Sequence, residues 1–201
     1  MPDTLRDGKG RGFLAAINSD NQLLTRSTSV EQRLKSALDD NYFELTTGRI
    51  SLTDANETAV VYLKNQNTSG KVLVIDRFFY DCWTSTGGSG ADGILRYYKN
   101  PTSATGGTAI IPDITNYGST ITAVGTFLSG NTATPITLTG GTVWWSAYLT
   151  DKLSMALEEG RIVVPNGSSH AITVAAPAGN TSMFLSLNVA FYYFNPQLIG
   201  S

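Results

Sequence analysis

The stretch 58–83 constrains the fold more strongly than any other part of the sequence. It reads TAVVYLKNQNTSGKVLVIDRFFYDCW, two long runs of β-branched residues and leucine joined by a polar segment. Asn67, Ser69 and Gly70 are residues that tight turns favour, so the stretch predicts a β-hairpin. Both strands are apolar on both faces near the turn, and such strands need a cover on each side. One cover would be the second sheet of a sandwich, and the other would be a helix, an arm or another subunit.

From residue 41 to the end, short apolar runs alternate with turn residues. The clearest run, 182–194, has one wholly apolar face, made of Met183, Leu185, Leu187, Val189, Phe191 and Tyr193. Many short strands at intervals of about ten residues predict a sandwich or a barrel. The number of strands fits a single eight-stranded jelly roll best. We therefore predict an all-β chain in which residues 41–201 form a single jelly-roll-like β-sandwich.

Residues 1–40 have a different character and predict an extended N-terminal arm followed by one short helix. Glycines at positions 8, 10 and 12 make the segment before Phe13 too glycine-rich to hold a shape alone. Thr28 and Glu31 form a capping box, and an apolar stripe at helical spacing follows it. We expect the helix over about 29–39 and regard it as the first candidate for the second cover of the hairpin.

The arm also carries the candidate partner-binding residues. Its basic residues could pair with acidic surface on a partner, and its short apolar segments could anchor on a neighbouring chain. These candidates are Arg6, Lys9, Arg11, Phe13, Leu14, Ile17, Leu23 and Leu24.

Composition narrows the class of protein. Only 15% of the 201 residues are charged, against about 25% in a typical globular domain, which suits a surface that is buried against copies of itself. The net charge of -2 argues against nucleic acid and anionic membranes as partners. No apolar run reaches the length of a transmembrane helix, and the first residues do not resemble a signal peptide, so we expect synthesis in a cytoplasm. The single cysteine, Cys82, lies in an apolar run and is expected to be buried and inert.

Catalytic motifs are absent from the sequence. His170 is the only histidine, and it follows Ser168 and Ser169 in a predicted turn, where we expect it to be solvated. No phosphate-binding loop or dinucleotide fingerprint occurs. Paired carboxylates for glycoside hydrolysis stay open, because such pairs form in space rather than in sequence. We predict that the chain is not an enzyme and holds no cofactor or metal.

Two adjacent tryptophans, Trp144 and Trp145, lie in the predicted strand 143–150 (VWWSAYLT). Because side chains alternate along a strand, one of the pair should face the core and the other should face outward. The outward tryptophan would be an exposed aromatic contact, either an anchor between subunits or a platform on which a carbohydrate stacks.

Several stretches resemble a group of tailed-bacteriophage virion structural proteins. Residues 11–15 (RGFLA) and 18–24 (NSDNQLL) are similar to the N-terminal arm of that group. Residues 165–169 (PNGSS) and 177–183 (PAGNTSM) resemble its closing hairpin, and residues 57–77 resemble an earlier one. The chain departs from the group at Asn166, where the group has a second proline.

The resemblance implies a jelly-roll protein that assembles on the phage particle, usually as a homotrimer. Within that group the expected role is a capsid decoration (cement) protein, which stabilises the head by binding the major capsid protein. It places the protein on the capsid surface of the virion after synthesis in the host bacterial cytoplasm. The alternatives are another virion component, such as a tail, baseplate or head-fibre protein, and a carbohydrate-binding or receptor-binding module. A carbohydrate binder should expose an aromatic residue and acids around one concave site.

Overall fold

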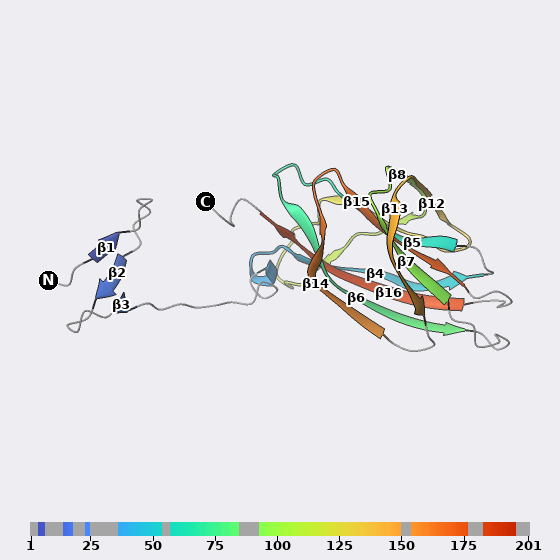
Figure 1. Ribbon diagram of the computed structural model, residues 1–201, viewed down its shortest axis with the longest axis horizontal. Helices are drawn as coiled ribbons and strands as arrows, with labels where there is room; N and C mark the ends of the chain where they lie inside the picture. Colours follow the sequence, from blue (N-terminus) through green and yellow to red (C-terminus); the bar gives the residue numbers. More distant parts are fainter. Residues whose placement is uncertain are drawn as a thin grey trace. The chain divides into compact units, whose positions relative to one another are not determined.

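The structure is a computed structural model, shown in Figure 1. It describes residues 4–6, 14–17, 23–24, 36–53, 57–84, 93–149, 154–176 and 183–195. The chain divides into two compact units, Met1–Gln32 and Arg33–Ser201. The division therefore falls before the short helical segment rather than after residue 40.

The N-terminal unit contains a small antiparallel sheet of its own. Its strands are β1 (Thr4–Arg6), β2 (Leu14–Ile17) and β3 (Leu23–Leu24), in the order β1-β2-β3. Arg6 lies opposite Leu14, and Ile17 lies opposite Leu23. The short apolar segments 14–17 and 23–24 thus form two of the three strands. The use of this unit as an arm stays a prediction.

The predicted helix is described only at its C-terminal end. Residues 36–38 are helical, whereas residues 29–35, which include Glu31 of the capping box, lie outside the described residues. The helix ends in a Schellman motif: the amide of Asn41 donates to the carbonyl of Ser36 (2.8 Å), and that of Asp40 donates to Ala37 (3.3 Å). Asp40 has the positive φ of 55° that this ending requires. The chain then turns directly into the first strand of the sandwich.

Two antiparallel sheets form the larger unit, and the prediction of an all-β sandwich is confirmed. The five-stranded sheet has the order β10 (Asp113–Ile114), β4 (Tyr42–Leu52), β16 (Met183–Phe194), β6 (Val72–Thr84), β14 (Ser154–Val164). The main path of the other sheet is β13 (Thr142–Leu149), β7 (Gly93–Lys99), β15 (Ser169–Ala175), β5 (Glu57–Asn65), β11 (Gly125–Ser129), β9 (Thr108–Ala109). Two further strands, β12 (Ile136–Thr139) and β8 (Ser103–Gly106), pair with each other, and β12 also pairs with β5.

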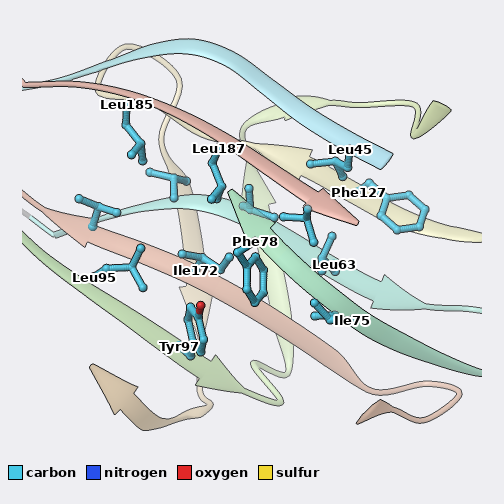
Figure 2. Packing of buried hydrophobic residues seen from close by; sticks show 14 of the residues in the cluster. Leu45, Leu63, Ile75, Phe78, Leu95, Tyr97, Phe127, Ile172, Leu185 and Leu187 are labelled. Carbon is cyan, nitrogen blue, oxygen red and sulfur yellow. The ribbon is translucent and has the colours of Figure 1, made fainter. Parts of the chain in front are cut away.

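The core lies between the two sheets and is drawn from both (Figure 2). Phe78 of β6 and Tyr97 of β7 meet across the sandwich with ring centroids 5.0 Å apart. Phe127 of β11 and Phe191 of β16 stack at 5.4 Å. The apolar face predicted for the last strand is confirmed, because all six of its residues are buried, and Cys82 is buried as expected.

The outer face of β5 is covered by the antiparallel strand pair β8 and β12 of the same chain. Tyr62 of β5 and Ala171 of β15 are buried in a second apolar cluster with Ile136 of β12, and Leu138 and Ala104 pack against it. In Figure 1, β8 and β12 lie above β5, whereas β4, β16 and β6 lie below it. The expectation that a helix, an arm or another subunit covers this strand is wrong here. The weakly patterned segment after residue 101 supplies the cover instead.

The prediction of a β-hairpin over 58–83 is wrong, because its two strands lie in different sheets: β5 pairs with β11, β12 and β15, whereas β6 pairs with β14 and β16. The short helix covers the outer face of β6. Ala37 packs on a cluster that includes Tyr42, Val74 and Tyr192. Beneath it, the hydroxyl of Tyr42 donates to Oδ2 of Asp76 at 2.7 Å, and Asp76 is buried. Burial and the neighbouring Asp76 carboxyl raise the pKa of Tyr42 well above its usual value. The expected role of the helix as a second cover is therefore realised for β6 but not for β5.

The long connection between β7 and β13 closes one side of the sandwich. It adds β11 and β9 beyond β5 in one sheet and β10 beyond β4 in the other. Tyr193 holds it to the core, because its hydroxyl donates to the carbonyl of Val124 at 2.7 Å. Burial raises the pKa of Tyr193 to about 12. The strands that end the sheets on this side, β9 and β10, have two residues each, which leaves little edge for another chain to pair with.

Candidate interaction surface

The opposite side of the sandwich ends in two long strands, β13 and β14. Each is the last strand of its sheet in the described part of the chain. β13 has the sequence TVWWSAYL, which contains no charged residue. Trp144 is 46% exposed, Trp145 39% and Tyr148 70%, and Val143 and Val163 of β14 are exposed as well. We call Val143, Trp144, Trp145, Tyr148 and Val163 the apolar edge.

A β-bulge explains why both tryptophans are exposed. The pairing of β13 with β7 shifts between Val143 and Trp145, so that Trp144 is an extra residue. Both indole rings consequently lie near Tyr97, at 5.7 Å for Trp144 and 4.5 Å for Trp145. The prediction that strict alternation sends one tryptophan into the core and the other outward is wrong. The bulge breaks the alternation, and the end position of the strand leaves both rings partly uncovered.

A cleft of about 480 Å³ opens between the two sheets beside this edge. Strand β14 contributes one apolar wall through Ile162, Val163 and Val164, and Trp144 lies among the other lining residues. The remaining lining residues come from the ends of β7 and β15 and from the turn before β15: Lys99, Asn100, Pro165, Ser168, Ser169 and His170. The cleft and the apolar edge therefore form one continuous, mainly apolar surface.

His170 is a buried strand residue, and the expectation that it is a solvated turn residue is wrong. It lies on β15, is 2% exposed, and has the rings of Phe78, Tyr97 and Trp144 around it. Burial lowers its pKa to about 3. Its Nε2 atom has no hydrogen-bond partner among the described residues. A histidine that is neutral across the physiological range is poorly matched to acid–base catalysis near pH 7, but it can bond to a group brought by a partner.

The predicted arm residues belong to the N-terminal unit, whereas Trp144 and Trp145 belong to the second unit. Arg6 lies on β1, Leu14 and Ile17 lie on β2, and Leu23 and Leu24 form β3. The other three candidates, Lys9, Arg11 and Phe13, lie outside the described residues.

Sequence reasoning missed most of the apolar edge. It singled out Trp144 and Trp145 but not Val143, Tyr148 or Val163. The uncharged character of the run 142–149 was visible in the sequence. Its position at the end of a sheet was not, because the order of strands depends on pairing between distant segments.

Comparisons with known proteins do not narrow the function of the chain, and neither do metal-ligand groups or membrane-spanning helices. No protein-family model, curated protein or solved structure matches the chain. Within the described ranges, no group of three or more histidine, cysteine, aspartate or glutamate residues could hold a metal ion. No helix in the described part of the chain has the length and hydropathy that crossing a bilayer requires.

Proposed function

We propose that the chain is a bacteriophage virion structural protein that decorates the capsid. In this proposal it forms a homotrimer on the capsid surface and stabilises the phage head by binding the major capsid protein. The apolar edge is the observation that carries the proposal. The resemblance of residues 11–24 and 165–183 to tailed-bacteriophage virion proteins is the reason for proposing a phage capsid as the partner of the trimer.

The apolar edge is unusual for a surface that stays in water. An exposed edge strand offers unpaired backbone groups to other chains, and proteins normally protect such a strand with charge, shortness or a cover. The chain uses shortness on its opposite side, at β9 and β10, but leaves eight uncharged residues at β13. Contact with copies of the same chain would bury both the edge and the adjoining cleft. A stable contact of this kind buries about 1,600 Å² in total.

We further infer that the sandwich is a jelly roll. In chain order the eight long strands are β4, β5, β6, β7, β13, β14, β15 and β16. In one sheet the neighbours are β4, β16, β6 and β14, which are strands one, eight, three and six of this series. In the other sheet they are β13, β7, β15 and β5, which are strands five, four, seven and two. Two sheets that share eight strands in this interleaved way have the double Greek-key arrangement of a jelly roll.

The two apolar strands β5 and β6 do not by themselves call for another subunit. Each has its inner face in the core between the sheets, and β8, β12 and the short helix cover their outer faces. The case for assembly rests instead on the apolar edge. In this proposal the unit Met1–Gln32 is the part that reaches the capsid.

The first test is the mass in solution of the full-length chain and of a form that lacks residues 1–26. We expect both to be trimers by light scattering, because the apolar edge lies in the sandwich. We expect only the full-length chain to bind purified capsids. A full-length chain that stays monomeric at high concentration would overturn the proposal.

The same measurements separate the other virion roles. A trimer that binds isolated tail, baseplate or head-fibre preparations, but not capsids, would indicate one of those components. The carbohydrate-binding alternative needs a different test, which uses a hollow on the outer face of the five-stranded sheet and not the apolar edge.

A further inference from the structure

A hollow of about 800 Å³ lies on the outer face of the five-stranded sheet, beside the connection from β10 to β11. Its volume is within the range of small-molecule sites. The sheet supplies Glu44, Thr46 and Asn188, and the connection supplies Asp113, Ile114, Thr115, Asn116, Tyr117 and Ser119. With the exception of Ile114, every lining side chain carries an oxygen or an amide.

The strand register brings the polar groups together on one face. Asp113 of β10 lies directly opposite Glu44 of β4, and Thr46 lies opposite Asn188 of β16. Like charges at directly opposed positions destabilise a sheet, so the register places Asp113 and Glu44 at a cost in stability. On the outer face of β16, Tyr192 lies in an apolar cluster under the short helix, whereas Asn188 on the same face is exposed. Packing within the sandwich does not explain why this face changes from apolar to polar along the strand.

Only one of the two carboxylates has a cation beside it. A guanidinium nitrogen of Arg77 lies 3.3 Å from a carboxylate oxygen of Glu44, and the side chain between them is the small Ala190. Asp113 forms no ion pair with the described residues. The lining beyond these carboxylates is neutral, with the hydroxyls and amides of Thr46, Ser119 and Asn188 among its groups. The lining thus combines one carboxylate paired with Arg77, one carboxylate without an ion pair among the described residues and many neutral donors and acceptors. The number of neutral donors and acceptors favours a neutral, hydroxyl-rich ligand, and the test below includes a cation as the competing outcome.

Hydrogen bonds to the start of β4 fix the wall of the hollow. The amide of Thr115 donates to the carbonyl of Tyr42 at 3.1 Å, and the side-chain amide of Asn116 donates to Oδ1 of Asp40 at 2.6 Å. The backbone of Gly118 donates to the side-chain oxygen of Asn116 at 3.4 Å. These bonds fix the backbone of the wall and the side chain of Asn116, so the neighbouring side chains start from defined positions.

Tyr117 projects from this fixed wall. Its exposed fraction is 105%, the highest among the exposed large apolar side chains. A tyrosine ring offers a broad apolar face and a polar tip, and such rings pack well on ligands that are apolar on one face and polar at the rim. A hexose is such a ligand, because its C–H groups lie on the faces of the ring and its hydroxyls lie around it.

We propose that this hollow binds a neutral hexose unit of a glycan. Tyr117 packs on the ring face, the carboxylates of Asp113 and Glu44 accept hydrogen bonds from the sugar hydroxyls, and the amide of Asn188 donates one. Hydrogen bonds to ionised acceptors are stronger than neutral ones, so the carboxylates carry most of the specificity. This site is separate from the apolar edge, and it goes beyond the structural role proposed above.

The test is ligand-observed saturation-transfer NMR with the purified full-length chain. The probes are maltotriose, lactose, mannobiose and cellobiose at millimolar concentration, with spermidine as a cationic probe. The variants are Tyr117→Ala and Asp113→Asn, and the matched control is Tyr148→Ala, which removes an exposed tyrosine on β13. Urea unfolding of each variant checks that the fold is kept.

We expect at least one saccharide to bind, and its affinity to fall about tenfold or more in Tyr117→Ala and Asp113→Asn but not in Tyr148→Ala. Binding of no saccharide, or of spermidine alone, would overturn the proposal. So would saccharide binding that both variants leave unchanged. The mass in solution of the same samples reports separately on assembly, so failure of one proposal does not affect the other.

Discussion

His170 gives the sandwich a sensitivity to acid that a surface histidine would not. Its pKa falls from 6.5 in the unfolded chain to about 3 in the folded protein, because burial disfavours the charged ring. Above pH 6.5 both states hold a neutral ring, and this residue makes no contribution to pH dependence. Between pH 6.5 and 3 the unfolded state binds a proton that the folded state does not. The free energy of unfolding therefore decreases by up to about 1.4 kcal/mol for each unit by which the pH is lowered between 6.5 and 3.

The variant His170→Leu tests this linkage. We expect it to lose less stability than the wild type between pH 6.5 and about pH 4, because it has no ring to protonate in the unfolded state. At neutral pH its stability should stay within about 1 kcal/mol of the wild type, because it also removes a buried Nε2 without a partner among the described residues. Urea unfolding at the two pH values measures both effects. Parallel pH profiles for the two proteins would contradict the prediction.

The buried contact of Tyr42 with Asp76 leads to a second prediction at this scale. Tyr42→Phe removes a 2.7 Å hydrogen bond to a buried carboxyl, so we expect a loss of about 1–3 kcal/mol in the free energy of unfolding. Tyr62→Phe is the matched control, because Tyr62 is equally buried but its hydroxyl bonds to no described residue. Its loss should stay below about 1 kcal/mol. Equal losses in urea unfolding would show that the hydrogen bond is not the cause.

Among the elements, the strand pair of β8 and β12 depends on Gly106, the last residue of β8. Gly106 has a φ of 76°, and a Cβ placed there would lie 2.4 Å from the carbonyl oxygen of Pro135. Gly70 has nearly the same φ, 75°, but a Cβ there would meet nothing within 4 Å. The two positions therefore separate backbone strain from steric clash.

We expect Gly70→Ala to cost about 1–2 kcal/mol, the price of a left-handed backbone for a residue with a Cβ. Gly106→Ala should cost clearly more, because the clash also displaces the β8–β12 strand pair that covers Tyr62. Thermal or urea unfolding measures the difference. Equal losses would show that the strand pair accommodates the methyl group and still covers Tyr62.

The elements also show how far the sequence could predict the fold. The two strands within 58–83 and the apolar face of β16 follow from local pattern, and the structure has them. The pairing of those two strands in a hairpin was predicted wrongly, because β5 and β6 belong to different sheets. The bulge at Trp144 could not be predicted, because it depends on how β13 pairs with β7. The burial of His170 was hidden for a similar reason: its neighbours Phe78 and Tyr97 come from distant strands. Local pattern identifies strands, whereas pairing and order decide which side chains meet.

The candidate surfaces also divide into what local sequence shows and what strand pairing decides. Aromatic residues such as Trp144 could be recognised by type, but the apolar edge required the strand order. The hollow required the register of β10 on β4, a pair of only two residues that no periodicity reveals.

For the whole molecule, the apolar edge predicts how association is broken. Tyr148→Lys places a charge on β13 at a side chain that is 70% exposed, so the fold should tolerate it while the contact between copies does not. We expect a trimer in the wild type and a monomer in this variant by light scattering. Tyr117→Lys, on the connection after β10, is the control and should remain a trimer. A trimeric Tyr148→Lys variant would exclude the edge as the contact.

The unequal sides of the sandwich bear on how large an assembly can become. A subunit that binds copies of itself through two opposite sides can form open fibres, because each added copy leaves one binding side free. This sandwich ends in two-residue strands at β9 and β10 on one side and in the long strands β13 and β14 on the other. Copies that meet through the second side use up their adhesive surface around a common axis. Growth then stops at a small closed cluster, so a chain with so apolar an edge can accumulate without forming fibres.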